Sequence, residues 1–175
     1  MTHFTRKITK NTPLLAIIAL FCTFLAIFLI SACNKLTSEN TVTINCPTKV
    51  NYTKDVNAAQ RTAMIAYCTA NNINYTVDSS GVLYQIITPG ASTKVTLCES
   101  LSITYTGKLL NGTQFDAGTI YFDLSSLIVG WQIVVPNIGK GGHIKILIPS
   151  SLAYGTQARG LIPANSPLYF DIILN

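Results

Sequence analysis

The chain has 175 residues, 49% of them hydrophobic, and a formal net charge of +5. This length suits one domain with additional segments. Residues 1–32 carry three basic residues and no acid, and the remainder has nine Lys and Arg against seven acids, a net charge of +2. These charges are scattered singly, so nothing in the composition supports binding to nucleic acid, which needs a clustered basic face.

The N-terminus is expected to be a secretory signal. Three basic residues precede an almost wholly apolar run over 13–30, the order typical of such signals. Its 18 residues could also nearly span a bilayer as an uncleaved anchor. The small residues Ser31 and Ala32 directly before Cys33 look like a bacterial lipoprotein box and favour cleavage after residue 32, with lipid on Cys33. An ordinary cleavage site beside an incidental Cys is the third alternative.

A lipidated Cys33 predicts a protein anchored to a bacterial membrane. We expect the outer membrane, with the protein facing the periplasm or the cell surface. Beyond Cys33 the chain has Cys46, Cys68 and Cys98, and three thiols cannot all pair internally. A Cys46–Cys68 disulfide is one hypothesis, and buried or free thiols without a role are the other. His143 stands alone in sequence, so neither a metal site nor a cofactor is predicted.

Residues 33–54 are rich in Asn, Thr, Ser and Lys and show little periodicity, which predicts a flexible tether. Residues 55–77 are expected to form an amphipathic helix and a connector. Apolar residues from Val56 to Cys68 recur at helical spacing, with Asp55 placed to cap the start and Asn71 followed by Asn72 to end the helix.

From residue 78 to the end, short strands are predicted at 82–87, 101–106, 113–116, 143–148 and 167–174. Asn111-Gly112 predicts a hairpin turn between the second and third of them. One short helix begins near Gly130, and Pro136 is expected to end it near Val135. Many strands with a single helix predict an α+β fold, an antiparallel half-barrel sheet wrapped around that helix.

Five blocks stand in a fixed order in this part of the chain. They are LSITYTG at 101–107, Phe115-Asp116 beyond the hairpin, Gly130-Trp131, IPSSLAYG at 148–155 and GLIPANSPLYFDI at 160–172. Together they resemble the FKBP-type, macrolide-binding peptidyl-prolyl isomerases over roughly 81–175. The resemblance implies an FKBP-type isomerase domain over 78–175, activity on Xaa-Pro segments of exported proteins, and binding of macrolide inhibitors. In this family an N-terminal helix often dimerises, so a homodimer is one expectation and a helix that only covers its own domain is the other.

The resemblance also implies the site residues. Those expected to carry catalysis are Tyr105, Phe115, Asp116, Trp131, Tyr154 and Phe170. Those expected to contact substrate are Phe122, Leu127, Ile128 and Ile162. In this arrangement Trp131 forms the floor under the Pro ring, Tyr154 offers its hydroxyl to a substrate carbonyl, and Asp116 accepts a hydrogen bond from a pocket Tyr. The backbone near Leu127 and Ile128 bonds the peptide carbonyls.

Isomerisation of an Xaa-Pro bond needs no acid, base or nucleophile. Its barrier of about 18–20 kcal/mol is the loss of amide resonance. An apolar pocket disfavours the planar, charge-separated amide relative to the twisted transition state. The alternative function, from a different class, is a non-catalytic chaperone or Pro-peptide binding module that uses the same groove, for which positions 133 and 134 would supply exposed apolar surface.

Overall fold

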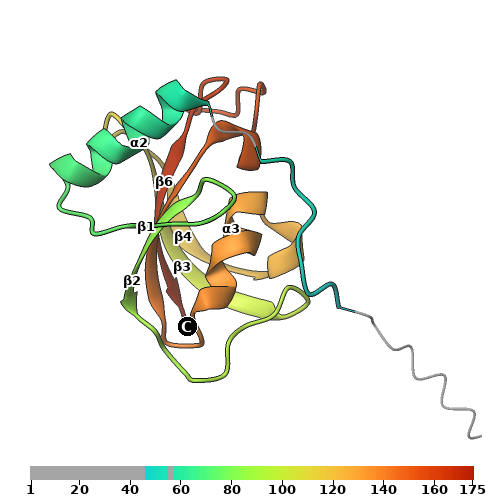
Figure 1. Cartoon of the computed structure of the whole chain (residues 1–175). Coiled ribbons are helices and arrows are strands. Elements are labelled where there is room, and N and C mark those ends of the chain that lie inside the picture. The colour runs from blue at the N-terminus through green and yellow to red at the C-terminus, as the bar shows by residue number, and fades with distance from the viewer. Residues whose placement is uncertain (1–45, 55–56) are drawn as a thin grey trace, which may run out of the picture. The chain divides into compact units, whose positions relative to one another are not determined.

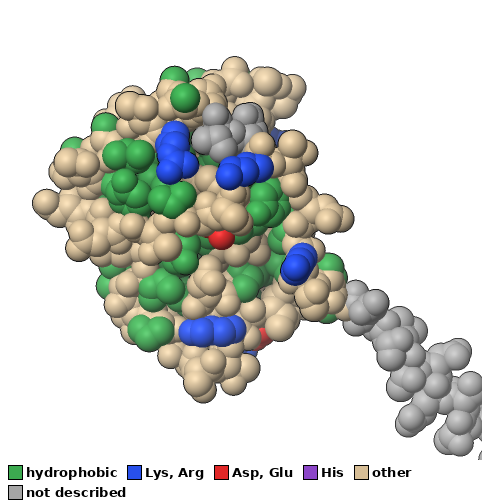
Figure 2. Space-filling view, in the orientation of Figure 1, with side chains coloured by type: hydrophobic (Ala, Val, Ile, Leu, Met, Phe, Trp, Pro, Cys, Tyr) green, Lys and Arg blue, Asp and Glu red, His purple; other side chains and the backbone are tan. Residues whose placement is uncertain are grey.

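The structure is a computed structural model that describes residues 46–54 and 57–175. The predicted signal, the apolar run over 13–30, Cys33 and the predicted cap Asp55 lie outside the described residues. Within the described part, no helix combines the length and the apolar character needed to cross a bilayer. On the face shown in Figure 2, the Lys and Arg side chains are separated from one another by polar and hydrophobic atoms.

The main element of the described part is one antiparallel sheet of six strands, in the order β1-β2-β5-β6-β3-β4 (Figure 1). The strands are β1 Thr76–Val77, β2 Leu83–Thr88, β3 Ser100–Leu109, β4 Gln114–Asp123, β5 His143–Ile148 and β6 Leu168–Leu174. The helices are α2 Ala58–Ala70 and α3 Val129–Val134, with single 3-10 turns at Leu124–Ser126, Val135–Asn137 and Ser150–Leu152. The predicted α+β fold, a curved antiparallel sheet with one short helix against it, is confirmed.

The two helices pack on opposite faces of the sheet, because successive side chains of a strand point to opposite faces. In β5, Ile146 and Ile148 belong to the larger core, which includes α3. The residue between them, Leu147, belongs to a second core with Met64 and Cys68 of α2. The short predicted helix α3 therefore fills the concave face, and α2 covers part of the other face.

Both helices end where the sequence indicates, but α2 begins later. The Asn57 side chain caps α2 by accepting the N–H groups of Ala59 at 3.0 Å and Gln60 at 3.3 Å, so the cap is Asn57 and not Asp55. At the other end, Asn71 caps the helix and Asn72 adopts a left-handed conformation with φ of 53°.

The end of α3 follows from its proline. The helix stops at Val134, and Pro136 lies in the following 3-10 turn, which confirms the predicted end near Val135. The predicted strands are all present. β5 has the predicted bounds, whereas β4 continues to Asp123 instead of ending at Asp116, and the two-residue strand β1 was not predicted.

Residues 46–54, which we call the strap, lie against the domain. Cys46 forms a disulfide with Cys98, just before β3. Cys68 is a buried free thiol, so the Cys46–Cys68 hypothesis is wrong. Further along the strap, Val50 packs on the larger core and Tyr52 Oη lies 3.4 Å from Ser79 Oγ. The last nine residues of the predicted flexible tether are therefore held to the domain.

The strap also covers the outer side of α3. Val50 and Tyr52 line one shallow hollow together with Ile133 and Pro136. Ile133 is half-buried and Val134 has no exposed surface. The expectation that positions 133 and 134 expose apolar surface is therefore wrong, and the chaperone alternative loses the observation that favoured it.

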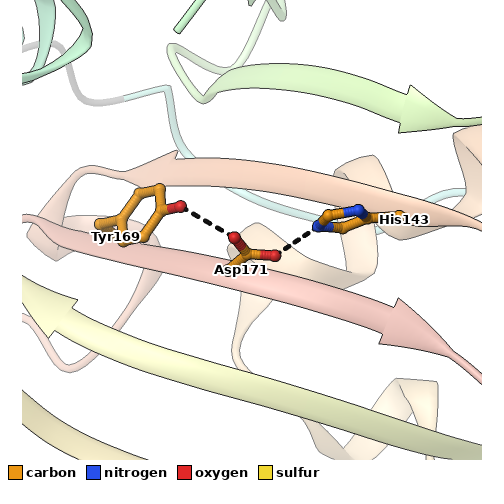
Figure 3. Close-up of polar contacts among 3 residues, drawn as sticks. All are labelled: His143, Tyr169 and Asp171. Carbon is orange, nitrogen blue, oxygen red and sulfur yellow. Dashed lines mark hydrogen bonds and ion pairs between the residues drawn. The ribbon is translucent and has the colours of Figure 1, made fainter. Parts of the chain in front are cut away.

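His143, which stands alone in the sequence, has a polar partner in the structure. Its Nε2 lies 2.5 Å from Asp171 Oδ1, and Tyr169 Oη donates to the other carboxylate oxygen at 3.2 Å (Figure 3). Burial and the adjacent Asp171 carboxylate raise the pKa of Tyr169. Asp171 follows Phe170 in β6 and so points to the opposite face of the sheet. This polar group links β5 to β6 on the face that carries α2.

Candidate active site

An open cavity of about 90 Å³ lies between β3, β4, α3 and the segment that follows β5. Its lining is mostly aromatic and aliphatic. The lining residues are Tyr105, Phe115, Asp116, Ile120, Leu127, Ile128, Trp131, Tyr154 and Phe170. An open cavity of this volume with an apolar lining can take a small apolar ring.

Edge-to-face contacts hold the aromatic rings of the cavity in place. The Trp131 ring centroid lies 5.1 Å from that of Phe170 and 5.5 Å from that of Tyr105, with interplanar angles of 89° and 76°. Phe115 meets Phe170 at 5.6 Å and 84°. These are the preferred geometries for aromatic pairs, each stabilising by about 0.5–1.5 kcal/mol beyond burial. The cavity walls are therefore set before any ligand enters.

A bulge in β4 brings two consecutive residues, Phe115 and Asp116, to the same cavity. Lys108 pairs with Gln114 and Gly107 pairs with Asp116, which leaves Phe115 as the extra residue of the strand. The Phe115 ring lies directly on Gly107, because a Cβ added there would be 2.5 Å from Phe115 Cε2. Regular alternation would have turned one of the two side chains away from the cavity.

Tyr105 and Asp116 form the polar edge of the cavity. Tyr105 Oη donates to Asp116 Oδ2 at 2.5 Å, as predicted for Asp116 and a pocket Tyr. Burial, then the hydrogen bond and charge of Asp116, and finally the nearby Tyr154, raise the pKa of Tyr105 to about 12. Tyr105 thus remains a neutral donor throughout the neutral pH range.

Trp131 contributes a buried polar atom as well as its ring. Among the buried side-chain nitrogen and oxygen atoms of the described residues, only Trp131 Nε1 makes no hydrogen bond within the protein. A buried donor without a partner costs about 1–3 kcal/mol and is uncommon in folded proteins. Its position in the cavity wall is consistent with a functional site.

Eight of the ten predicted site residues line this cavity, and two do not. The Phe122 side chain is 53% exposed and is not part of the cavity lining. Ile120, two residues earlier on the same face of β4, lines the cavity in its place. Ile162 is 6% exposed and belongs to the larger core, but it does not line the cavity. Its backbone instead pairs with Arg159, whose guanidinium lies 5.2 Å from the centre of the Tyr154 ring.

The loop before α3 is held by the side chain of Gln132. Its amide nitrogen donates to the carbonyls of Leu127 at 2.6 Å and Ser125 at 3.0 Å. The Ile128 carbonyl accepts the N–H groups of Trp131 and Gln132, and the Leu127 N–H bonds the Leu124 carbonyl at 3.2 Å. The backbone of this loop is thus fixed where it meets the cavity.

Comparison of the sequence with known proteins shows which family has this fold. Residues 91–175 match the model of the FKBP-type peptidyl-prolyl cis-trans isomerase family. This part of the chain belongs to the FKBP family. Both the fold and the family predicted from the five sequence blocks are thereby confirmed.

The curated relatives are named as peptidyl-prolyl cis-trans isomerases. The FKBP-type peptidyl-prolyl cis-trans isomerase FkpA of Buchnera aphidicola (subsp. Schizaphis graminum) is 42% identical over 102 residues, which cover 55% of this chain and 40% of the relative. The peptidyl-prolyl cis-trans isomerase Mip of Coxiella burnetii is 34% identical over 117 residues, 62% of this chain and 51% of the relative. This chain thus spans about half or less of the length of these relatives.

Solved structures agree with the fold. The crystal structure of FkpA from Escherichia coli superposes with a TM-score of 0.59 at 31% identity, covering 67% of this chain and 58% of that one. A peptidyl-prolyl cis-trans isomerase from Pseudomonas syringae gives a TM-score of 0.57 at 29% identity, covering 70% of this chain and 96% of that one.

Proposed function

We propose that this protein catalyses cis–trans isomerisation of Xaa-Pro bonds in exported proteins. The observation that supports it is the preformed aromatic cavity, in which Trp131, Phe170, Tyr105 and Phe115 contact one another around a space suited to one small ring. The family name of the relatives points to the same reaction.

The cavity can act by desolvation. A Pro ring placed on Trp131 brings its amide into an apolar environment, where the planar, charge-separated form loses the solvation that water provides. An acceleration of about 10⁵-fold requires roughly 7 kcal/mol of differential stabilisation. We assign the hydrogen bonds of the site to the Tyr154 hydroxyl and the Ile128 amide, because the Leu127 N–H already bonds within the loop.

A protease-coupled assay on the purified full chain in detergent tests this activity. We expect acceleration of Xaa-Pro isomerisation with a preference for a bulky apolar Xaa, since each methylene buried against the cavity wall contributes about 0.8 kcal/mol. A macrolide inhibitor should abolish the acceleration. A rate equal to that of the uncatalysed peptide would overturn the proposal.

We further propose that the protein acts in the bacterial cell envelope, anchored by lipid on Cys33. The support is the basic start, the apolar run over 13–30 and the small residues before Cys33. The Cys46–Cys98 disulfide is consistent with an oxidising compartment.

The variant Cys33→Ser tests the anchor. It should lose metabolic labelling with a fatty acid and leave the membrane fraction once the signal is cleaved elsewhere. Equal labelling of the variant and the wild type would instead favour an ordinary apolar anchor. The variant Cys68→Ser, which removes a buried thiol of the domain, is the control and should be labelled as the wild type is.

A further inference from the structure

One side chain of α2, Gln60, joins this helix to the segment that carries Tyr154. Its amide oxygen accepts the Ser150 N–H at 2.9 Å. Its amide nitrogen donates to Ser150 Oγ at 2.8 Å and to the Asn165 carbonyl at 3.0 Å. Gln60 therefore holds the two ends of one loop, residues 150–165, at the same time.

Tyr154 lies in that loop. Its two neighbours in sequence, Ala153 and Gly155, form backbone hydrogen bonds to the residues at the ends of the loop. The Ser150 carbonyl accepts the N–H of Ala153 at 3.0 Å and of Gly155 at 2.8 Å. The Gly155 carbonyl accepts the Asn165 N–H at 2.8 Å. The residues on either side of Tyr154 are therefore bonded to residues that Gln60 holds.

The contacts of Gln60 have no ready substitute in water. Ser150 is only 6% exposed, so loss of Gln60 would leave a buried N–H and a buried hydroxyl without their partner. The helix itself stays in place through Met64 and Cys68, which are buried against the sheet independently of Gln60. Loss of the amide should thus loosen the loop more than the fold.

We propose that Gln60 is a positioning residue for Tyr154 and thereby fixes the cavity wall from outside the segment that matches the family model. It lies upstream of residues 91–175, the segment that matches the family model, so this contact comes from the N-terminal helix. The inference rests on the proposed isomerase activity. A displacement of well under 1 Å at a preorganised site is enough to reduce its rate.

Kinetics of the full chain in detergent provide the first test. We expect Gln60→Ala to lower kcat/KM by about 3- to 10-fold, the effect of one or two neutral hydrogen bonds. Gln60→Glu keeps the acceptor for the Ser150 N–H but cannot donate to the Asn165 carbonyl, so it should recover part of the loss. Thr62→Ala is the matched control, because the Thr62 hydroxyl bonds only the Ala58 carbonyl within α2, and it should leave the rate unchanged.

A double-mutant cycle separates positioning from general destabilisation. If Gln60 acts through Tyr154, then Gln60→Ala should cause little further loss in a Tyr154→Phe background. Losses that multiply independently in the double variant would overturn the inference.

Hydrogen exchange at the Ala153 and Gly155 amides gives a readout that does not depend on activity. Both amides should exchange faster in Gln60→Ala than in the wild type, with no change in Thr62→Ala. Unchanged exchange would overturn the inference, even if activity fell. Should the wild type show no isomerase activity, the proposed function would fail, and the exchange rates alone would decide whether Gln60 holds the loop.

Discussion

Asp116 and Phe115 are neighbours in the cavity lining, and each would matter most in a different mechanism. An acid–base reaction would depend on the Asp116 carboxylate, whereas desolvation depends on the Phe115 ring, which packs on Gly107 and Phe170. We expect Asp116→Asn to reduce kcat/KM less than Phe115→Ala does. The same protease-coupled assay on both variants measures this order, and the reverse order, with Asp116→Asn inactive and Phe115→Ala harmless, would mean that the chemistry is acid–base.

The Tyr154 hydroxyl should have a moderate effect. We expect Tyr154→Phe to lower kcat/KM by about 2- to 13-fold, because it removes one hydrogen bond of about 0.5–1.5 kcal/mol and keeps the ring. Tyr154→Ala should cost more, since it also opens the cavity to water. Circular dichroism of both variants should show an intact fold, and a Tyr154→Phe rate equal to that of the wild type would assign the hydroxyl no role.

The raised pKa of Tyr105 predicts how stability changes at high pH. The phenol has an ordinary pKa near 10 in the unfolded chain and about 12 in the folded one. The folded state therefore holds the proton more tightly, and this contribution is complete below pH 10 and disappears as the pH rises to 12. Urea unfolding should show a smaller loss of stability between pH 10 and 12 for Tyr105→Phe than for the wild type. Identical pH profiles would contradict this interpretation of the Tyr105–Asp116 contact.

At the scale of elements, α3 packs closely on the sheet because Gly130 has no side chain at the point of contact. A Cβ added to Gly130 would lie 2.4 Å from Ile148 Cγ2, and Ile148 is fully buried. We expect Gly130→Ala to destabilise the protein by about 1–3 kcal/mol through overpacking, despite the better helix propensity of Ala. Gly118→Ala is the control, because a Cβ there would meet nothing within 4 Å. Thermal unfolding that ranks the two variants equally would contradict this account of the contact.

The strands differ in how well the sequence predicts them, and the reason is burial. β5 has four buried residues in six, bounded by polar and glycine residues, and its predicted bounds were correct. β4 is an edge strand in which only Phe115 and Ile120 are even partly buried, so its second half lacks a hydrophobic pattern. Its length is set by backbone pairing with β3, which composition does not reveal. Ile120 was missed, and Phe122 was expected at the cavity, because the strand was predicted to end at Asp116.

The site was predicted better than the contacts that support it. Eight of the ten predicted residues line one cavity, because the family blocks keep their order along the chain. The bulge that aims Phe115 and the Gln60 bonds to the Tyr154 loop arise only when distant segments meet in space. The Cys46–Cys98 pairing is a third example, since spacing alone does not specify which thiols meet.

At the scale of the whole molecule, the disulfide joins the strap to the sheet across 52 residues of sequence. Closing a loop of this size restricts the unfolded chain and typically stabilises a protein by about 2–4 kcal/mol. We expect the double variant Cys46→Ser/Cys98→Ser to lose stability in this range in urea unfolding. Reductant should lower the stability of the wild type to the same level and leave the variant unaffected. A wild type that is indifferent to reductant would show that strap packing alone suffices.

For the lipid anchor proposed at Cys33, the same bond would limit how far the domain can travel from the membrane. With lipid on Cys33, only the twelve residues 34–45 separate the bilayer surface from the fixed point at Cys46. Even fully extended, they span at most about 40 Å. Without the bond and the strap contacts, the free segment would run to the start of α2, twice as many residues, and its maximum span would double. With the proposed lipid anchor on Cys33, the disulfide would thus confine the domain to a layer about 40 Å thick next to the membrane.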